Sequence, residues 1–180
     1  MLGLVALACR GSAPRATPFD AGDVDASAEV AKLGAFLPPT LGRFSATDAP
    51  TLTGGGLFIE ARRSYADASG KEVQVELATG DVRPRLTILE GEEAHAFGSD
   101  SPTYWRTTTI AGHRARIAEE QPVVVSSKCY VHLEPNHVAQ VDVHPATAGE
   151  CAAIAALLDF KGIIASRGVP GPPLEPGRRR

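Results

Sequence analysis

The chain contains no apolar run of the roughly 20 residues that a membrane-spanning helix needs, so no transmembrane span is predicted. Its globular part also lacks clustered lysines and arginines, and the formal net charge is −3. Proteins that bind nucleic acid need a basic surface, because contacts to phosphate dominate their affinity. Nucleic acid is therefore not a predicted partner.

Catalytic signatures are also missing. The chain has no nucleophile elbow, zincin helix, phosphate loop or dinucleotide fingerprint. Residues 54–56 are three glycines, but they lack the lysine that a phosphate loop requires and precede an expected strand. Glu119 and Glu120 are adjacent, so they point apart on a strand, and we expect solvated surface there. The histidines show no metal-ligand spacing. We predict no catalytic residue, no metal ligand and no cofactor.

What the chain does have is the composition of one ordinary domain with tails. It is 180 residues long, with 43% apolar and 22% charged side chains. We place the domain at residues 29–166. Residues 10–28 mix Pro, Gly, Ser and Ala without an apolar period and predict a flexible tether. Residues 167–180 are rich in Pro and Arg and predict a disordered tail.

Residues 1–9 (MLGLVALAC) are apolar and end in small residues followed by Cys9. This pattern resembles the end of a bacterial lipoprotein signal, in which the cysteine is lipidated. It departs from that signal because Ala6 stands where leucine is usual and no basic segment precedes the short apolar run. A start codon assigned too late explains the departure, so we expect the native N-terminus upstream of Met1. The alternative is an unstructured N-terminus with a stray cysteine.

Apolar periodicity and turn residues predict two hairpins and two helices. The hairpins pair residues 57–65 with 71–77, and residues 104–110 with 113–118 around Ala111-Gly112. The helices span residues 27–36 and 147–158, the latter capped by Thr147. Residues 83–98 fit either a strand or a short helical crossover.

Residues 123–144 predict a third hairpin, with residues 135–137 as a three-residue turn. In this register the apolar residues share one side of the sheet and the polar ones the other. The inward pairs are Leu133 with Ala139, Val131 with Val141 and Cys129 with Val143. The outward pairs are His132 with Gln140, Tyr130 with Asp142 and Lys128 with His144. The predicted fold class is α+β, an antiparallel sheet of five to seven strands with the N- and C-terminal helices packed on one face.

Cys129 and Cys151 are expected to point into the same layer. Cys129 faces inward in the predicted hairpin, and Cys151 lies with Ile154 and Leu158 on the apolar stripe of the last helix. A disulfide between them closes a loop of about 22 residues and is worth roughly 3 kcal/mol. An oxidising envelope favours this bond, whereas two separate buried thiols are the alternative.

Tyr104 and Trp105 open a predicted strand, and Trp105 is the sole tryptophan. Aromatic side chains often line ligand grooves, so these two residues form a candidate groove. The alternative is a core or sheet-end plug.

Five segments together resemble a group of uncharacterised bacterial secreted or lipid-anchored proteins. They are residues 36–44 (FLPPTLGRF), 65–67 (YAD), 71–80 (KEVQVELATG), 104–112 (YWRTTTIAG) and 157–160 (LLDF). The resemblance implies strands and turns in an exported protein and carries no functional residue. It favours a non-catalytic envelope lipoprotein in the periplasm, anchored to the membrane at Cys9, that binds or scaffolds another envelope component. The alternatives are a periplasmic carrier of a small apolar ligand and a hydrolase.

Overall fold

The fold was analysed in a computed structural model, which describes residues 26–55, 58–82, 85, 103–120, 125–133 and 135–166. Four expectations lie wholly or mostly outside these residues. They are the signal with Cys9, most of the tether, the C-terminal tail and, except for residue 85, the segment 83–98.

The described residues form a mostly antiparallel sheet with a few short helices, which agrees in part with the predicted α+β class. The helices are α1 (Ala26–Ala35), α3 (Glu150–Ala155) and α4 (Phe160–Ala165). The strands are β1 (Thr40–Leu41), β2 (Phe44–Ala46), β3 (Thr51–Gly55), β4 (Phe58–Ala66), β5 (Glu72–Gly80), β6 (Thr103–Ile110), β7 (His113–Glu120), β8 (Ser127–Leu133) and β9 (His137–His144).

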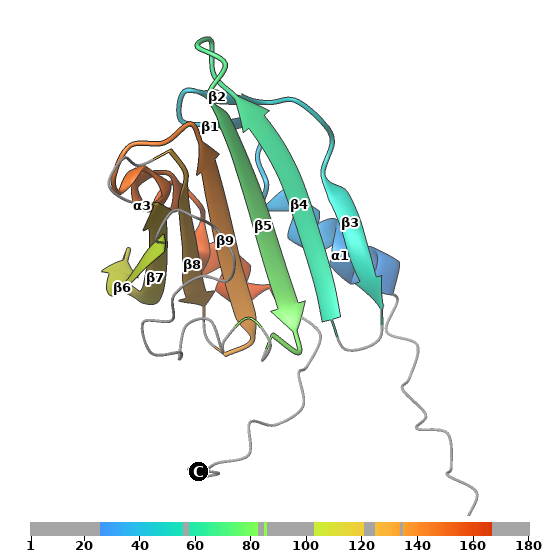
Figure 1. Ribbon diagram of the computed structural model, residues 1–180. Helices are drawn as coiled ribbons and strands as arrows, with labels where there is room; N and C mark the ends of the chain where they lie inside the picture. Colours follow the sequence, from blue (N-terminus) through green and yellow to red (C-terminus); the bar gives the residue numbers. More distant parts are fainter. Residues whose placement is uncertain are drawn as a thin grey trace, which may run out of the picture.

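The sheet order is β1-β2-β4-β5-β9-β8-β7-β6, with β3 pairing with β4 beside β2 (Figure 1). The predicted count of five to seven strands is wrong, since the described residues form nine. The missed strands include β1 and β2, which span two and three residues and are too short to show an alternating pattern.

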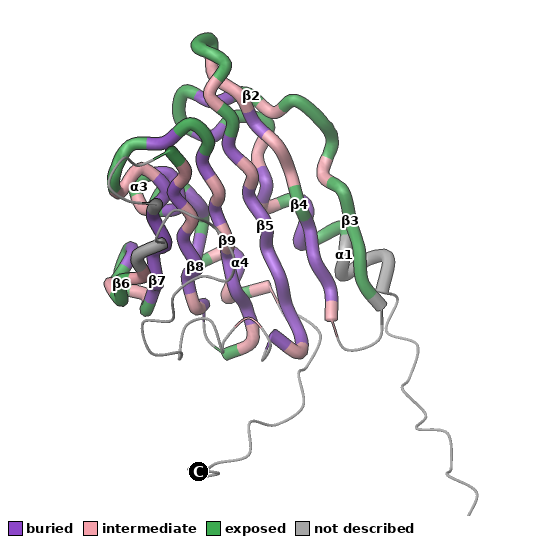
Figure 2. Tube along the Cα trace, in the orientation of Figure 1, coloured by how far each residue is buried: buried purple, intermediate pink, exposed green. Residues whose placement is uncertain are grey.

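Alternation of side chains separates an inner from an outer face of the sheet. Figure 2 shows β5 buried along most of its length, and Val73, Val75 and Leu77 of this strand belong to the main buried cluster and are fully buried. Residues of all three helices belong to the same buried cluster, including Leu33, Cys151 and Ile163. The inner face therefore carries the core, and the outer face faces away from the helices.

The hairpins β4–β5 and β6–β7 confirm two predictions. Ala111 and Gly112, between β6 and β7, both have positive φ angles, of 48° and 86°. A two-residue loop with both φ values positive matches the right-handed twist of the flanking strands.

The predicted register of the hairpin β8–β9 is wrong by two residues. His137 does not lie in the turn but begins β9, and the described residues of the turn are 135 and 136. A two-residue shift leaves every side chain on its predicted face. The observed partners are Leu133 with His137, Val131 with Ala139, Cys129 with Val141, His132 with Val138, Tyr130 with Gln140 and Lys128 with Asp142.

The first helix is close to its predicted range, but only Glu150–Ala155 of the predicted helix 147–158 is helical, as α3, and α4 beyond it was not predicted. Gly149, with a φ angle of 73°, is the N-cap of α3 in place of Thr147. The backbone N–H and hydroxyl of Thr147 instead donate to Glu150, at 2.9 and 3.0 Å. Asp159 separates the helices because its carboxylate caps α4, accepting from the N–H of Gly162 at 2.9 Å.

Gly54→Ala is expected to lower the free energy of unfolding by about 2 kcal/mol, because Gly54 has a φ angle of 133° that other residues rarely adopt. A Cβ there would also lie 2.8 Å from the Cα of Ile59 and press on the carbonyl of Phe58. Gly70→Ala is the matched control, since a Cβ at Gly70 meets no atom within 4 Å and only its φ angle of 81° opposes it. We expect that control to cost about 1 kcal/mol, from the backbone conformation alone. Urea unfolding of both variants measures the difference, and equal losses would contradict the close approach of β3 to β4.

Candidate functional site

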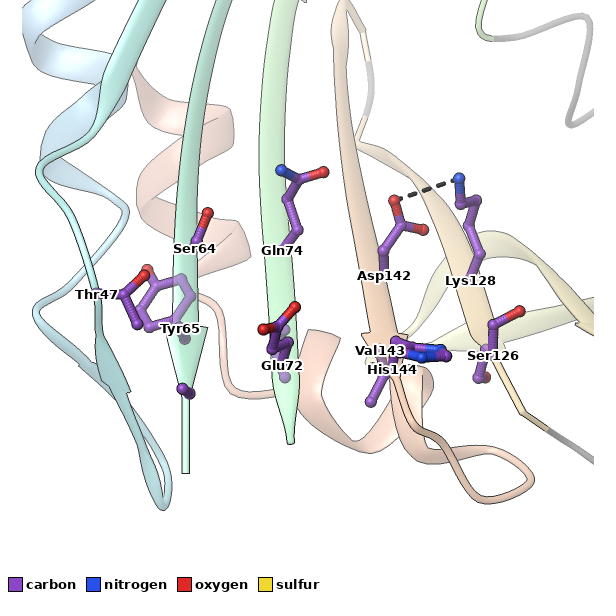
Figure 3. A pocket seen from close by; sticks show the side chains of 13 residues that line it. Thr47, Ser64, Tyr65, Glu72, Gln74, Ser126, Lys128, Asp142, Val143 and His144 are labelled. Atoms are coloured by element: carbon purple, nitrogen blue, oxygen red, sulfur yellow. Dashed lines mark ion pairs between the residues drawn. The ribbon is translucent and has the colours of Figure 1, made fainter. Parts of the chain in front are cut away.

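A polar trough crosses the outer face of the sheet over β4, β5, β9 and β8, with a volume of about 580 Å³. Figure 3 shows Ser64, Gln74, Asp142 and Lys128 standing side by side, one from each strand. The strand pairing explains this row, because Ser64 pairs with Gln74, Gln74 with Asp142 and Asp142 with Lys128. A second row, nearer the end of the sheet, contains the exposed side chains of Glu72 and His144.

Asp142 is the central charged group of the polar trough. Its Oδ2 lies 3.3 Å from the Nζ of Lys128 and accepts a hydrogen bond of 2.9 Å from the side-chain amide of Gln140. Its Oδ1 is buried and has no hydrogen-bond donor among the described residues. One oxygen of this carboxylate is therefore fixed, and the other is unsatisfied.

Gln140 is itself oriented by a hydrogen bond from Arg85. The guanidinium of Arg85 donates to the side-chain oxygen of Gln140 at 3.1 Å, so the amide must present its nitrogen to Asp142. Arg85 also binds the carboxylates of Glu60, at 2.6 Å, and Glu76. A chain of contacts thus runs from two largely buried glutamates to Asp142. Such support from a second layer of residues is what holds a binding group in place.

The same two glutamates, Glu60 and Glu76, also form ion pairs with a second arginine. Arg62 contacts Glu76 at 2.7 Å and Glu60 at 3.2 Å. Burial and the neighbouring Glu76 raise the pKa of Glu60, while Arg85 and Arg62 oppose the rise. The paired arginines explain how Glu76, only 3% exposed, is accommodated in the sheet.

The candidate groove at Tyr104 and Trp105 is not part of the polar trough. Trp105 is half-buried on the outer face, 5.9 Å from the ring of Tyr130 and 4.9 Å from the guanidinium of Arg116. Burial, with the charge of Asp142, raises the pKa of Tyr130 to about 12. The side chain of Tyr104 lies outside the described residues.

The structure brings Cys129 and Cys151 together in the core, as expected, but as free thiols and not as a disulfide. The two side chains are hydrogen-bonded. This bond and burial raise the pKa of Cys129, whereas the bond from Cys129, aided by Ser127, lowers the pKa of Cys151. Cys151 is thus the more acidic of the two thiols.

Glu119 is not on solvated surface, as we expected, but only 7% exposed on the inner face. It accepts hydrogen bonds from the N–H of Gly149 at 2.6 Å and from the hydroxyl of Ser127 at 3.1 Å. The prediction failed because the adjacent glutamates point to opposite faces, so one of them must turn inward. A polar residue at an inward position of the alternating pattern was the available signal.

Acidification below about pH 6.5 is expected to destabilise the protein in part through His137. Its ring is 3% exposed, and neither nitrogen has a hydrogen-bond partner among the described residues. Burial lowers the pKa of His137, although the backbone at Ser166 partly offsets this. The unfolded chain therefore binds a proton that the folded chain resists, so stability falls as pH drops from 6.5 towards the lowered pKa. An NMR titration of the imidazole C–H signals measures that pKa, and a value at or above 6.5 would contradict the prediction.

No group of three or more His, Cys, Asp or Glu side chains in the described part of the chain is arranged to hold a metal ion. Of the described helices, none has the length and apolar character needed to cross a bilayer. Comparison of the chain with protein-family models, curated proteins and solved structures found no match.

Proposed function

We propose that the protein is a non-catalytic lipoprotein of the bacterial envelope, and that the polar trough binds another envelope component. The binding role is supported mainly by the carboxylate of Asp142. Lys128 and Gln140 fix one of its oxygens, and the other has no hydrogen-bond partner among the described residues. Groups that are oriented in advance lose less conformational entropy when a partner binds.

The charges of the polar trough favour recognition over catalysis. Its cation Lys128 pairs with its central anion Asp142, and no hydrogen bond joins His144 to Ser126 among the described residues that line the trough. A nucleophile needs an adjacent base that removes its proton. We therefore assign the trough a binding role.

A carrier of apolar ligands is the less favoured alternative. The space between the inner face and the helices is filled by packed side chains such as Val141, Ile154 and Phe160. The polar trough lies on the opposite face, and nine of its thirteen lining residues are polar or charged. A polar partner on the outer face fits this arrangement better than an apolar ligand under the helices.

The membrane anchor remains a proposal at Cys9, with the tether holding the domain away from the bilayer. Metabolic labelling with palmitate, in bacteria that carry the gene with its upstream region, tests this part. We expect the label to enter the native protein and to be lost in Cys9→Ala. A native protein without label would overturn the anchor while leaving the trough unaffected.

Photo-crosslinking in cells tests the binding role. A benzoylphenylalanine at Gln74 stands in the polar trough, whereas one at the exposed Lys161 of α4 lies on the helix-covered side. We expect a defined cross-linked product from position 74 and none from position 161. No product from position 74, or the same product from both, would overturn the proposal.

A further inference from the structure

We infer that the polar trough binds a neutral, polyhydroxylated ligand, that is, a glycan. This inference rests on the proposed binding function and names the class of ligand. The volume of about 580 Å³ falls within the range of small-ligand sites, roughly 300–1,000 Å³. The hydrogen-bond donors and acceptors that line the trough indicate the class of ligand.

The row across the polar trough offers both donors and acceptors. Ser64 and Gln74 can each donate and accept, Lys128 only donates, and the ionised Asp142 only accepts. Neighbouring strands lie about 4.8 Å apart, so these groups follow one another at roughly the length of a pyranose ring. Sugar hydroxyls also donate and accept, and adjacent hydroxyls fit the two oxygens of a carboxylate.

The charge of the polar trough disfavours ionic ligands. Asp142 already neutralises Lys128, and Glu72 adds a negative charge at the rim. An anion would therefore meet a carboxylate without a free cation to compensate it. A cation would have to compete with Lys128 for Asp142. A neutral hydroxyl faces neither penalty.

The unsatisfied oxygen of Asp142 points to a donor. Its Oδ1 has no partner among the described residues, and an unpaired buried acceptor costs free energy. A ligand hydroxyl can donate to this carboxylate, whose side chain is 25% exposed, if the carboxylate turns to present that oxygen to the trough. An apolar ligand cannot, and it would also cover the polar groups of Ser64 and Gln74.

Trp105 reports binding without taking part in it. Along the same row, Lys128 pairs with Ala118 and Ala118 pairs with Trp105, so the indole lies about two strand spacings, roughly 10 Å, from Lys128. Because it is the sole tryptophan, the emission of the full chain comes from this one site.

The test titrates the full chain with chitotetraose, cellotetraose and maltotetraose, followed by Trp105 emission and calorimetry. We expect at least one neutral oligosaccharide to bind, and Gln74→Ala and Asp142→Asn to weaken it at least tenfold. Thr107→Ala, exposed on the outer face but outside the polar trough, is the matched control and should bind as the native chain does. Thermal unfolding checks that the variants fold.

Absence of binding to all three oligosaccharides, or binding that Gln74→Ala leaves unchanged, would overturn the inference. Photo-crosslinking separates this failure from that of the proposed function. A protein cross-linked from position 74 without oligosaccharide binding keeps the binding role and rejects the glycan. No product from position 74 and no oligosaccharide binding rejects both.

Discussion

Glu119→Leu is expected to lower the free energy of unfolding by about 3 kcal/mol. The carboxylate lies between β7, β8 and the start of α3, where it accepts from the N–H of Gly149 and the hydroxyl of Ser127. Leucine has a similar volume, so packing changes little, but both donors lose their acceptor. Each unsatisfied buried donor costs about 1–3 kcal/mol. Urea unfolding followed by circular dichroism measures the loss.

Two further variants define the cause of that loss. Both donors contact the same oxygen of Glu119, Oε1, so the amide oxygen of Glu119→Gln can keep both hydrogen bonds, and we expect less than half the loss of the leucine variant. Glu72→Leu removes an exposed carboxylate of the same sheet and should change stability by less than about 0.5 kcal/mol. Equal losses in Glu119→Gln and Glu119→Leu would show that the hydrogen bonds of Glu119 do not hold α3 on the sheet.

Local signals in the sequence were sufficient for the two hairpins β4–β5 and β6–β7. The hairpin β4–β5 combines alternating apolar residues on β5 with a turn that contains Gly70, and β6–β7 has a turn that contains Gly112. Both glycines adopt positive φ angles. Such turns depend on few residues, so the pairing follows from neighbours in the chain. The same reasoning placed Cys129 on the inner face, because alternation fixes the face even when the register is wrong.

The polar trough could not be predicted in the same way. Its row joins Ser64, Gln74, Asp142 and Lys128 from four strands, and a two-residue shift in one hairpin changes the neighbours. The predicted register paired Lys128 with His144, which hid the ion pair with Asp142. The pairing of β5 with β9 also joins segments far apart in the chain, and no turn signals it.

Breaks between helices were equally hard to predict. Residues 147–158 are rich in alanine and leucine and favour one helix by propensity. The observed helix α3 covers only Glu150–Ala155. Beyond it Leu158 and Phe160 are both buried, and the bond from Gly162 to Asp159 begins the separate helix α4. Tertiary packing thus overrides the local preference.

Oxidation of Cys129 and Cys151 to a disulfide is expected to raise the free energy of unfolding by about 3 kcal/mol, because the bond closes a loop of about 22 residues in the unfolded chain. The side chains already contact each other, so the bond requires little rearrangement. Before folding is complete, one of the two thiolates attacks the disulfide of an oxidant such as oxidised glutathione and releases one glutathione thiol. The other cysteine then displaces the second glutathione thiol, so two protons and two electrons leave the protein.

The compartment decides whether this reaction occurs, since both thiols are fully buried and folded protein shields them from oxidants. Protein exported to an oxidising space should therefore gain the bond as it folds, and protein kept in the cytosol should retain two thiols. Alkylation under denaturing conditions with mass spectrometry counts the thiols, and urea unfolding with and without reductant measures the stabilisation. Cys129→Ala with Cys151→Ala removes the pair and should abolish the effect of reductant. If exported native protein retains both thiols, or if reductant leaves its unfolding midpoint unchanged, these cysteines no longer support a location in the oxidising envelope.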